Sequence, residues 1–262
     1  MRLATWNLNA PFTSAESRLS QWNWLATTVD ADVAVLTEAQ LPEQGLPAGW
    51  SAVHRDGGIG TRRKWGTIIA ARNGYELRDI TNGVTGRRGF NLSHSRPGAV
   101  TVTDVQRNGK LLVTVIGVYA LTTDSLGRKT GNGYASLLEI LSDLQPLFES
   151  DRRKRLVLAG DLNLWPTDLP KEIYRGFFDA VLETEKSRWE PGYCCVCEPD
   201  TKCGHLWTHW NRSAPNKIQN LDYIFISKKL YLRLGAVTGG RRDFPDSDKW
   251  SDHAPVVADL RV

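Results

Sequence analysis

The chain has 262 residues, 41% of them hydrophobic and 24% charged, and its formal net charge is +4 at neutral pH. This composition supplies a hydrophobic core and excludes an intrinsically disordered protein. No apolar run approaches the ~18 residues that a helix needs to cross a bilayer, so we expect no membrane span. The first residues lack the charged and apolar regions of a secretory signal, which favours a cytoplasmic protein. The length fits one domain over residues 1–262.

Eight short apolar runs, each bounded by turn residues, predict β-strands. Several are continuous stretches of Val, Ile, Leu and Ala, a pattern typical of strands that are buried on both faces. In chain order the predicted strands are Leu3–Asn7, Val33–Thr37, Thr67–Ala71, Val100–Asp104, Leu112–Tyr119, Leu156–Ala159, Tyr223–Ile226 and Val256–Leu260.

Three segments have the apolar spacing of helices. Glu16–Val29 and Tyr134–Phe148 each place apolar residues three and four positions apart, and Ser14 is a plausible N-cap of the first. Pro170–Leu182 begins with a proline, which the first turn of a helix tolerates. Many strands with few helices predict a layered α/β or α+β sandwich.

Short polar motifs stand where predicted strands end or begin. They are Trp6-Asn7-Leu8-Asn9, Thr37-Glu38, Gly160-Asp161-Leu162-Asn163, Leu221-Asp222-Tyr223 and Ser251-Asp252-His253. Active sites are commonly assembled from polar groups at strand ends of a packed sheet. Taken singly, each motif could equally be a turn or a cap.

The residue types in these motifs suit metal-assisted attack on phosphorus. Carboxylate and amide oxygens are ligands for Mg²⁺, or Mn²⁺ in its place. Such a cation neutralises a phosphate oxygen, a carboxylate orients or deprotonates the attacking water, and a histidine held by a second carboxylate binds the phosphoryl oxygen.

The motifs, in this order and spread over nearly the whole chain, resemble those of the endonuclease/exonuclease/phosphatase superfamily. The segments that carry the resemblance are Thr5-Trp6-Asn7-Leu8-Asn9, Asp32-Val33-Ala34-Val35-Leu36-Thr37-Glu38, Gly117-Val118-Tyr119, Gly160-Asp161-Leu162-Asn163, Leu221-Asp222-Tyr223-Ile224 and Ser251-Asp252-His253-Ala254-Pro255-Val256. The resemblance implies a four-layered α/β/β/α sandwich in which helices flank two packed, mixed β-sheets, with the site at one edge.

The resemblance also implies a role for each motif residue. Metal binding falls to Glu38 and Asn7, with Asp252 and Asn9 nearby. Asp161 positions or deprotonates the water, and Asn163 hydrogen-bonds the phosphate or the water. His253 contacts the scissile phosphate, Asp222 orients His253, and Tyr119 contacts phosphate unless its hydroxyl serves only the core.

A nucleic acid is the predicted partner, on the strength of the basic charge, short arginine runs and ten tryptophans. Trp207 and Trp210 are candidates to stack on a base or sugar, and Arg212 to bind a phosphate. The alternative is that these tryptophans pack on the sheet edge. His94 lies in a polar segment that could approach substrate, although a structural role is the simpler interpretation. No obligate protein partner is implied.

All four cysteines, Cys194, Cys195, Cys197 and Cys203, fall in one short segment. Their spacing is not the usual paired C-x-x-C, so reduced thiols or one oxidised pair compete with a structural Zn²⁺ site. Zinc here would not be the catalytic metal, because sulfur ligands suit zinc and oxygen ligands suit magnesium.

Two departures weaken assignment to the abasic-site repair branch of the superfamily. Thr37 stands where many relatives have Gln, and Ala120-Leu121-Thr122-Thr123 lacks a Pro-Asn-Gly type of turn. A phosphatase or phosphodiesterase of small or lipid-linked phosphates therefore remains the alternative enzyme. A non-catalytic binding module on the same fold is the alternative of another class, disfavoured by the complete set of polar motif residues.

Overall fold

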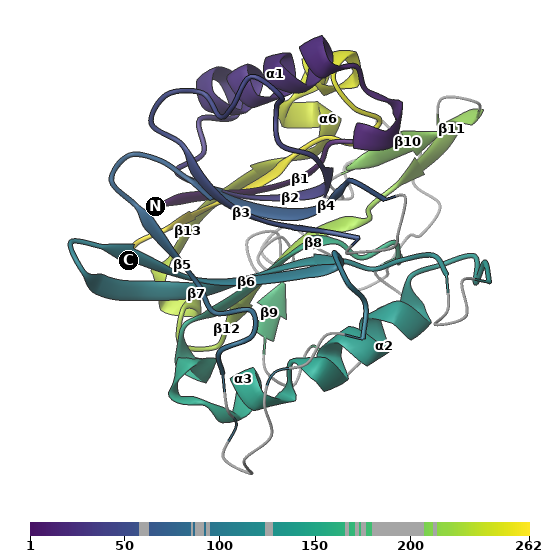
Figure 1. Ribbon diagram of the computed structural model, residues 1–262. Coiled ribbons are helices and arrows are strands. Elements are labelled where there is room, and N and C mark those ends of the chain that lie inside the picture. The colour runs from purple at the N-terminus through teal and green to yellow at the C-terminus, as the bar shows by residue number, and fades with distance from the viewer. Residues whose placement is uncertain are drawn as a thin grey trace.

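The computed structural model describes residues 1–57, 63–84, 86, 92, 95–123, 128–165, 168–170, 173, 177–179, 207–211 and 214–262. Two six-stranded β-sheets pack face to face, and helices cover the outer face of each (Figure 1). This four-layered arrangement confirms the predicted α/β/β/α sandwich. All eight predicted strands are present.

The first sheet has the order β13-β14-β1-β2-β4-β3. Its strands are β1 (Arg2–Asn7), β2 (Val33–Ala39), β3 (Ser51–Asp56), β4 (Gly66–Ala71), β13 (Leu234–Gly239) and β14 (Val256–Leu260). β1 and β2 run parallel, and the other neighbours are antiparallel.

The second sheet has the order β5-β6-β7-β8-β12-β9. Its strands are β5 (Glu76–Asp79), β6 (Val100–Arg107), β7 (Lys110–Tyr119), β8 (Leu156–Asp161), β9 (Phe177–Asp179) and β12 (Asp222–Ser227). Here β7 and β8 are the parallel pair. A separate ribbon of β10 (His209–Asn211) and β11 (Ala214–Gln219) lies beside the sheets (Figure 1).

Branched aliphatic side chains fill the space between the sheets. Val35 and Ile69 from the first sheet meet Val115 and Ile224 from the second, and all four are fully buried. The sheets come especially close at Gly117 of β7, where a β-carbon would lie 2.7 Å from the Thr67 methyl group. A glycine is needed there because any side chain would push the sheets apart.

The outer face of the first sheet is covered by α1 (Ala15–Trp24), which continues into a π-helical turn, Leu25–Val29. The Ser14 hydroxyl accepts a hydrogen bond from the Ser17 backbone N–H at 3.2 Å, which confirms the predicted N-cap. Trp22 and Trp24 of this helix pack with Trp6 of β1 in one buried cluster on this face of the sheet. The short α6 (Gly240–Asp243) lies on the same side (Figure 1).

The outer face of the second sheet carries α2 (Tyr134–Asp143) and α3 (Gln145–Glu149) (Figure 1). The sequence predicts one helix over Tyr134–Phe148, but Pro146 has no N–H to continue the hydrogen-bond ladder, and the helix divides before it. Short 3₁₀ turns complete the secondary structure of the described residues: Ala10–Phe12, Asp151–Lys154, Tyr231–Arg233 and Pro245–Lys249.

The predicted helix Pro170–Leu182 is wrong at residues 177–179, which form β9 and pair with β12. Pairing with an existing sheet edge outweighs the helical preference of this short segment; much of the remaining prediction lies outside the described residues. The strands that the sequence analysis missed include β3, β5 and β13, whose half-exposed residues do not form apolar runs. No helix in the described part of the chain is long and apolar enough to span a membrane.

Candidate active site

Five strands bring polar residues to one edge of the two sheets. Asn7 ends β1 and Glu38 lies near the end of β2, its parallel neighbour. Tyr119, at the end of β7, is opposite Asp161 of β8, which in turn is opposite Asp222 at the start of β12. The strand directions therefore explain why residues remote in the sequence meet at this edge.

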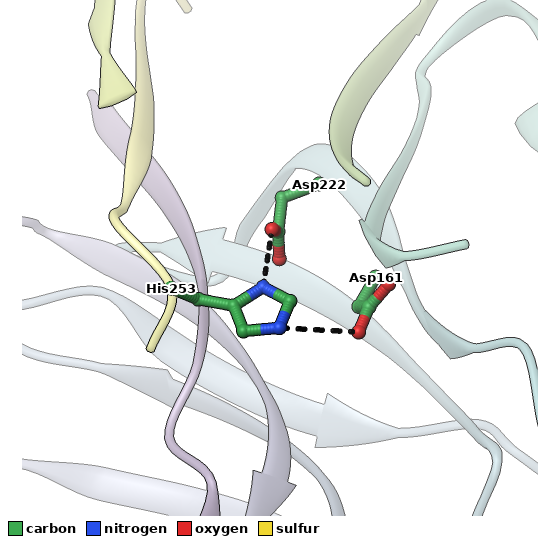
Figure 2. A group of neighbouring side chains, drawn as sticks. All are labelled: Asp161, Asp222 and His253. Carbon is green, nitrogen blue, oxygen red and sulfur yellow. Dashed lines mark hydrogen bonds and ion pairs between the residues drawn. The ribbon is translucent and has the colours of Figure 1, made fainter. Parts of the chain in front are cut away.

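His253 lies between two buried carboxylates (Figure 2). Its Nδ1 is 2.7 Å from Asp222 Oδ2, and its Nε2 is 4.0 Å from Asp161 Oδ2. The segment before β14 is held in place by Ser251, whose hydroxyl donates to the Asn7 carbonyl and accepts from the His253 backbone N–H. Trp6 Nε1 donates to the His253 carbonyl at 2.8 Å. His253 is thus held both through its backbone and through Nδ1 of its ring.

Asp161 is buried but well supplied with hydrogen-bond donors. Its Oδ2 accepts from Asn7 Nδ2 at 2.8 Å, and its Oδ1 accepts from the Asn163 backbone N–H at 2.8 Å. The Asn163 side chain itself donates to the Ala120 carbonyl at 3.0 Å. Asn163 therefore closes the turn after β8 and orients the Asp161 carboxylate.

Burial and charge shift the pKa values of this group in a defined way. Burial, together with repulsion from Asp222, raises the pKa of Asp161 to about 7. Burial alone would lower the pKa of His253, but the charge and hydrogen bond of Asp222 outweigh it and raise the pKa to about 10. At neutral pH the site thus combines an imidazolium donor with a carboxyl group that can accept a proton.

Glu38 receives two hydrogen bonds on one carboxylate oxygen. Tyr119 OH donates to Glu38 Oε1 at 2.7 Å, and Asn7 Nδ2 approaches the same atom at 3.3 Å. Burial and the charge of Glu38 raise the pKa of Tyr119 well above its ordinary value, so its hydroxyl remains a donor. Among the described residues, no hydrogen bond reaches the other oxygen of Glu38.

Three residues of the site have left-handed backbone conformations. Asn9, Glu38 and Asn163 have φ angles of 51°, 41° and 49°. Asparagine tolerates this region, whereas for glutamate it is strained. Strained backbone is found preferentially at functional sites, where the surrounding structure holds it in place.

Asn9 forms hydrogen bonds with both Asn7, which contacts Glu38, and Asp252. Its side-chain Nδ2 donates to Asp252 Oδ1 at 2.9 Å, and its backbone N–H donates to Asn7 Oδ1 at 2.9 Å. The second bond fixes the amide of Asn7 so that its nitrogen, not its oxygen, faces Glu38 and Asp161. Asn7 therefore acts in this structure as a donor that orients both carboxylates.

The ribbon β10–β11 supports the site from the side. Thr208 Oγ1 accepts from the backbone N–H groups of Leu221 and Asp222, and its carbonyl accepts from the Ala254 N–H at 2.6 Å. His209 next to it packs on His253, with ring centroids 4.6 Å apart and planes at 49°. The threonine of this segment thus positions Asp222, and the histidine covers His253.

The polar groups surround one cavity of about 290 Å³. Thirteen residues line it: Asn9, Phe12, Glu38, Gly131, Asn132, Asp161, Asn163, Trp165, His209, Gln219, Leu221, Asp252 and His253. Of the predicted catalytic and metal residues, six line the cavity directly. Asn7, Tyr119 and Asp222 lie behind them and hydrogen-bond to them.

Two groups of side chains at this edge offer metal ligands. Asp161, Asp222 and His253 place one ligand atom each within 4.8 Å of one another. The short Asp222–His253 hydrogen bond already uses two of these atoms, and we interpret the trio as a hydrogen-bonded relay. The other group is Glu38 and Asp252, two half-buried carboxylates on the cavity wall.

The predicted stacking residues are not brought into the cavity. Trp210 is only 7% exposed, and the Arg241 guanidinium lies over its ring, 5.0 Å from the centroid. Trp207 is half-buried and does not line the cavity. For Trp210 these observations favour the packing alternative, whereas stacking by Trp207 stays a prediction. His94, Arg212 and the cysteines Cys194, Cys195, Cys197 and Cys203 lie outside the described residues.

Seven residues of the cavity wall were not among the predicted site residues: Phe12, Gly131, Asn132, Trp165, His209, Gln219 and Leu221. His209 was not among the predicted site residues, yet it contacts His253, and its Nδ1 is 3.1 Å from Gln219 Oε1. Burial, with the charge of His253, lowers the pKa of His209 and keeps it neutral. Phe12 and Trp165 also line the cavity. Their only sequence signal is that each follows a site motif within three residues.

The overall structure is similar to solved structures of DNA-processing enzymes. An AP endonuclease from Archaeoglobus fulgidus matches with a TM-score of 0.67 and 18% identity over 100% of both chains. A 3'-5' exonuclease from Neisseria meningitidis matches at 0.63 and 19% over 99% of both chains. A Neisseria 3' phosphatase bound to a product DNA hairpin matches at 0.62 and 20% over 100% of both.

No protein-family model and no curated protein sequence matches the chain. The structural matches are below 25% identity, so the likeness concerns the fold, and it extends over the full length of the chain. The chain thus shares its fold with these solved structures, and this is the fold that the resemblance of its motifs implies.

Proposed function

We propose that this protein is a metal-dependent phosphoesterase that hydrolyses phosphodiester bonds of nucleic acid by in-line attack of water. The observation that carries the proposal is the position of Asp161 at the cavity wall, buried between Asn7 and the His253–Asp222 pair. The structural likeness to an AP endonuclease and to a 3' phosphatase bound to a product DNA hairpin supports a nucleic acid substrate.

In this mechanism Asp161 accepts the proton of the attacking water. A general base is most effective when its pKa lies near the working pH, and burial raises the pKa of Asp161 to about 7. Asn7 and Asn163 hold the carboxylate through one oxygen each. The water therefore meets a base of fixed orientation.

His253 stabilises the charge that develops on the phosphoryl group. Asp222 binds Nδ1, so the protonated ring presents Nε2–H on the side of Asp161 (Figure 2). A preoriented charged donor stabilises a phosphorane-like transition state more than the ground state. The buried, charged Asp222 keeps the ring protonated at neutral pH.

The donor set at Glu38 fits a hard divalent cation such as Mg²⁺, with Mn²⁺ as a substitute. Glu38 keeps one oxygen without a donor among the described residues, and Asp252 faces the same cavity. Glu38 and Asp252 would hold the cation, while Asn7, Asn9 and Tyr119 orient these carboxylates. When bound, the cation would neutralise a non-bridging phosphate oxygen and the leaving oxygen.

One observation favours a second candidate, a phosphatase of small phosphate monoesters. The cavity volume of about 290 Å³ is just below the roughly 300–1,000 Å³ that is usual for ligand pockets. A small phosphate ester would fill such a cavity. The catalytic groups and the cation would act in the same way on either substrate.

A substrate panel tests the proposal. Single-stranded, double-stranded and abasic DNA, RNA and inositol phosphates are incubated with Mg²⁺, with Mn²⁺ or with a chelator. We expect cleavage of a polynucleotide that the chelator abolishes and that weakens as salt rises, because phosphate contacts release counterions. Turnover of small phosphate esters without cleavage of any polynucleotide would select the second candidate. No turnover of any phosphoester would select a non-catalytic binding module.

A further inference from the structure

Exposed aromatic side chains border the catalytic cavity. In the described part of the chain, five large hydrophobic side chains are exposed: Phe12, Tyr134, Leu138, Trp165 and Leu232. Phe12 is 84% exposed and Trp165 is 36% exposed, and both line the cavity. The other three do not line it. An apolar surface at the mouth of a polar cavity marks a place where a ligand binds.

The two rings come from different sheets of the sandwich. Phe12 ends the 3₁₀ turn that follows β1 and Asn9, whereas Trp165 follows β8 and Asn163. The turn of Phe12 is closed by hydrogen bonds from the Phe12 N–H to the Asn9 carbonyl and from the Thr13 N–H to the Ala10 carbonyl. Each aromatic residue is thus tied to a catalytic motif through a few residues of chain.

The chemistry of the cavity wall limits what can bind there. The wall carries Asp161, Glu38 and His253, which handle the phosphate, while the two rings offer flat apolar surfaces. Stacking of a base on an aromatic side chain contributes ~1–3 kcal/mol and is tolerant of base identity. Both rings lie on the wall that also carries these groups, so a base bound against the rings would lie next to the phosphate.

We propose that Phe12 and Trp165 bind the single unpaired nucleobase next to the phosphate that is attacked. The inference rests on the proposed function and narrows its substrate to strands in which this base is free to leave its neighbours. A base in a duplex is already stacked on both faces, so it would have to unstack before it could reach these rings.

Kinetics on matched substrates test the proposal. Two single strands are compared that are identical except that one lacks the base beside the cleaved bond. We expect Phe12→Leu and Trp165→Leu, which keep apolar bulk but lose the ring, to lower kcat/KM for the complete strand by about 5- to 150-fold, the equivalent of ~1–3 kcal/mol. The baseless strand should be cleaved equally by wild type and variants. Equal losses on both strands, or no loss on either, would overturn the proposal.

Leu232→Ala is the matched control, because Leu232 is 83% exposed but does not line the cavity. This variant should cleave both strands with the kcat/KM of wild type. A loss specific to the complete strand in this variant would show that exposed apolar residues in general matter, and would count against the subsite.

Equilibrium binding separates a failure of the subsite from a failure of the proposed function. A nucleoside monophosphate, phenyl phosphate and ribose 5-phosphate are titrated by calorimetry into wild type and into Trp165→Leu. Tighter binding of the nucleotide in wild type, lost in the variant, would support the subsite even if no turnover is found. Equal affinity for all three phosphates would refute it. If phenyl phosphate bound as tightly as the nucleotide, the subsite would accept any planar ring, and the assignment to a nucleobase would be overturned.

Discussion

The same strands carry two contrasting regions of this molecule. In their middle, between the two sheets, residues such as Val35, Ile69 and Val115 are fully buried and wholly apolar. At or near their ends, the strands carry the polar residues Asn7, Glu38 and Asp161, and the Asn7 amide donates a hydrogen bond to each of the two carboxylates. The apolar region stabilises the fold. The fold in turn holds the polar groups of the edge close together, an arrangement that would be unfavourable without it. Substitutions should therefore separate stability from activity over a few residues of the same strand.

The largest expected effect is the loss of activity in Asp161→Asn. The amide keeps the shape of the side chain but cannot accept a proton, so kcat should fall by about 10²–10⁴-fold, as is typical of a lost general base. Thermal stability should stay the same or rise. Burial makes the ionised form of Asp161 unfavourable in the folded protein, and an asparagine does not ionise. The measurement is turnover of the polynucleotide found in the substrate panel, with a thermal melt of the same preparation.

Asp104→Asn is the matched control, a second buried aspartate remote from the cavity lining. Asp104 accepts from Thr114 Oγ1 at 2.6 Å and pairs with Arg152 at 2.8 Å. Its loss should cost ~1.5–3 kcal/mol of stability and leave kcat unchanged. If Asp104→Asn lost activity as severely as Asp161→Asn while still folded, the contrast between the two regions would fail.

The next effect is on the protonation of His253. In the metal-free protein the imidazole should remain protonated through neutral pH and titrate near 10. In Asp222→Asn the burial remains while the main attractive charge is gone, so the pKa of His253 should fall. Histidine resonances followed by NMR over pH give both values. An unchanged pKa in the variant would show that Asp222 does not set the charge of His253.

A substitution between the sheets should lower stability and leave activity nearly unchanged. Ile69→Ala removes a fully buried side chain and should lower the free energy of unfolding by ~2–5 kcal/mol. The kcat of the folded fraction should stay within about two-fold of wild type, because Ile69 lies in the apolar cluster between the sheets. Chemical denaturation gives the stability. If the variant were fully folded and its kcat were still much lower, the packing between the sheets would also affect the catalytic groups.

The smallest expected effect concerns the strained backbone of Glu38. Glycine adopts a φ of 41° without cost, so Glu38→Gly should be more stable than Glu38→Ala by ~1 kcal/mol, although both lose activity. The two variants are compared by chemical denaturation. Equal stabilities would indicate that the residue is not strained, and the idea that the edge stores strain would be abandoned at this position.

Much of the site could be predicted because its residues stand in short motifs at strand ends. Asp161, Asp222 and His253 were found in this way, although 31 residues separate the last two. The stacking residues could not be found in the same way. Trp210 and Trp165 look equally suitable as tryptophans in polar segments, and only their burial and neighbours distinguish them.

His209 illustrates a second reason for the gaps. A lone histidine without a motif has no signal in the sequence, and its contact with His253 depends on a β-bridge between segments far apart in the chain. The edge strands β3, β5 and β13 were missed because half-exposed strands lack continuous apolar runs. In both cases the deciding partner lies elsewhere in the sequence.

The sequence by itself determined where the buried strands lie and which chemical groups follow them, because apolar runs and local polar motifs depend on neighbouring residues only. The tertiary structure decided which of those groups share one cavity, which aromatic rings face it and how the pKa values of Asp161 and His253 are shifted. These properties depend on burial and on distances through space, and segments remote along the chain set both.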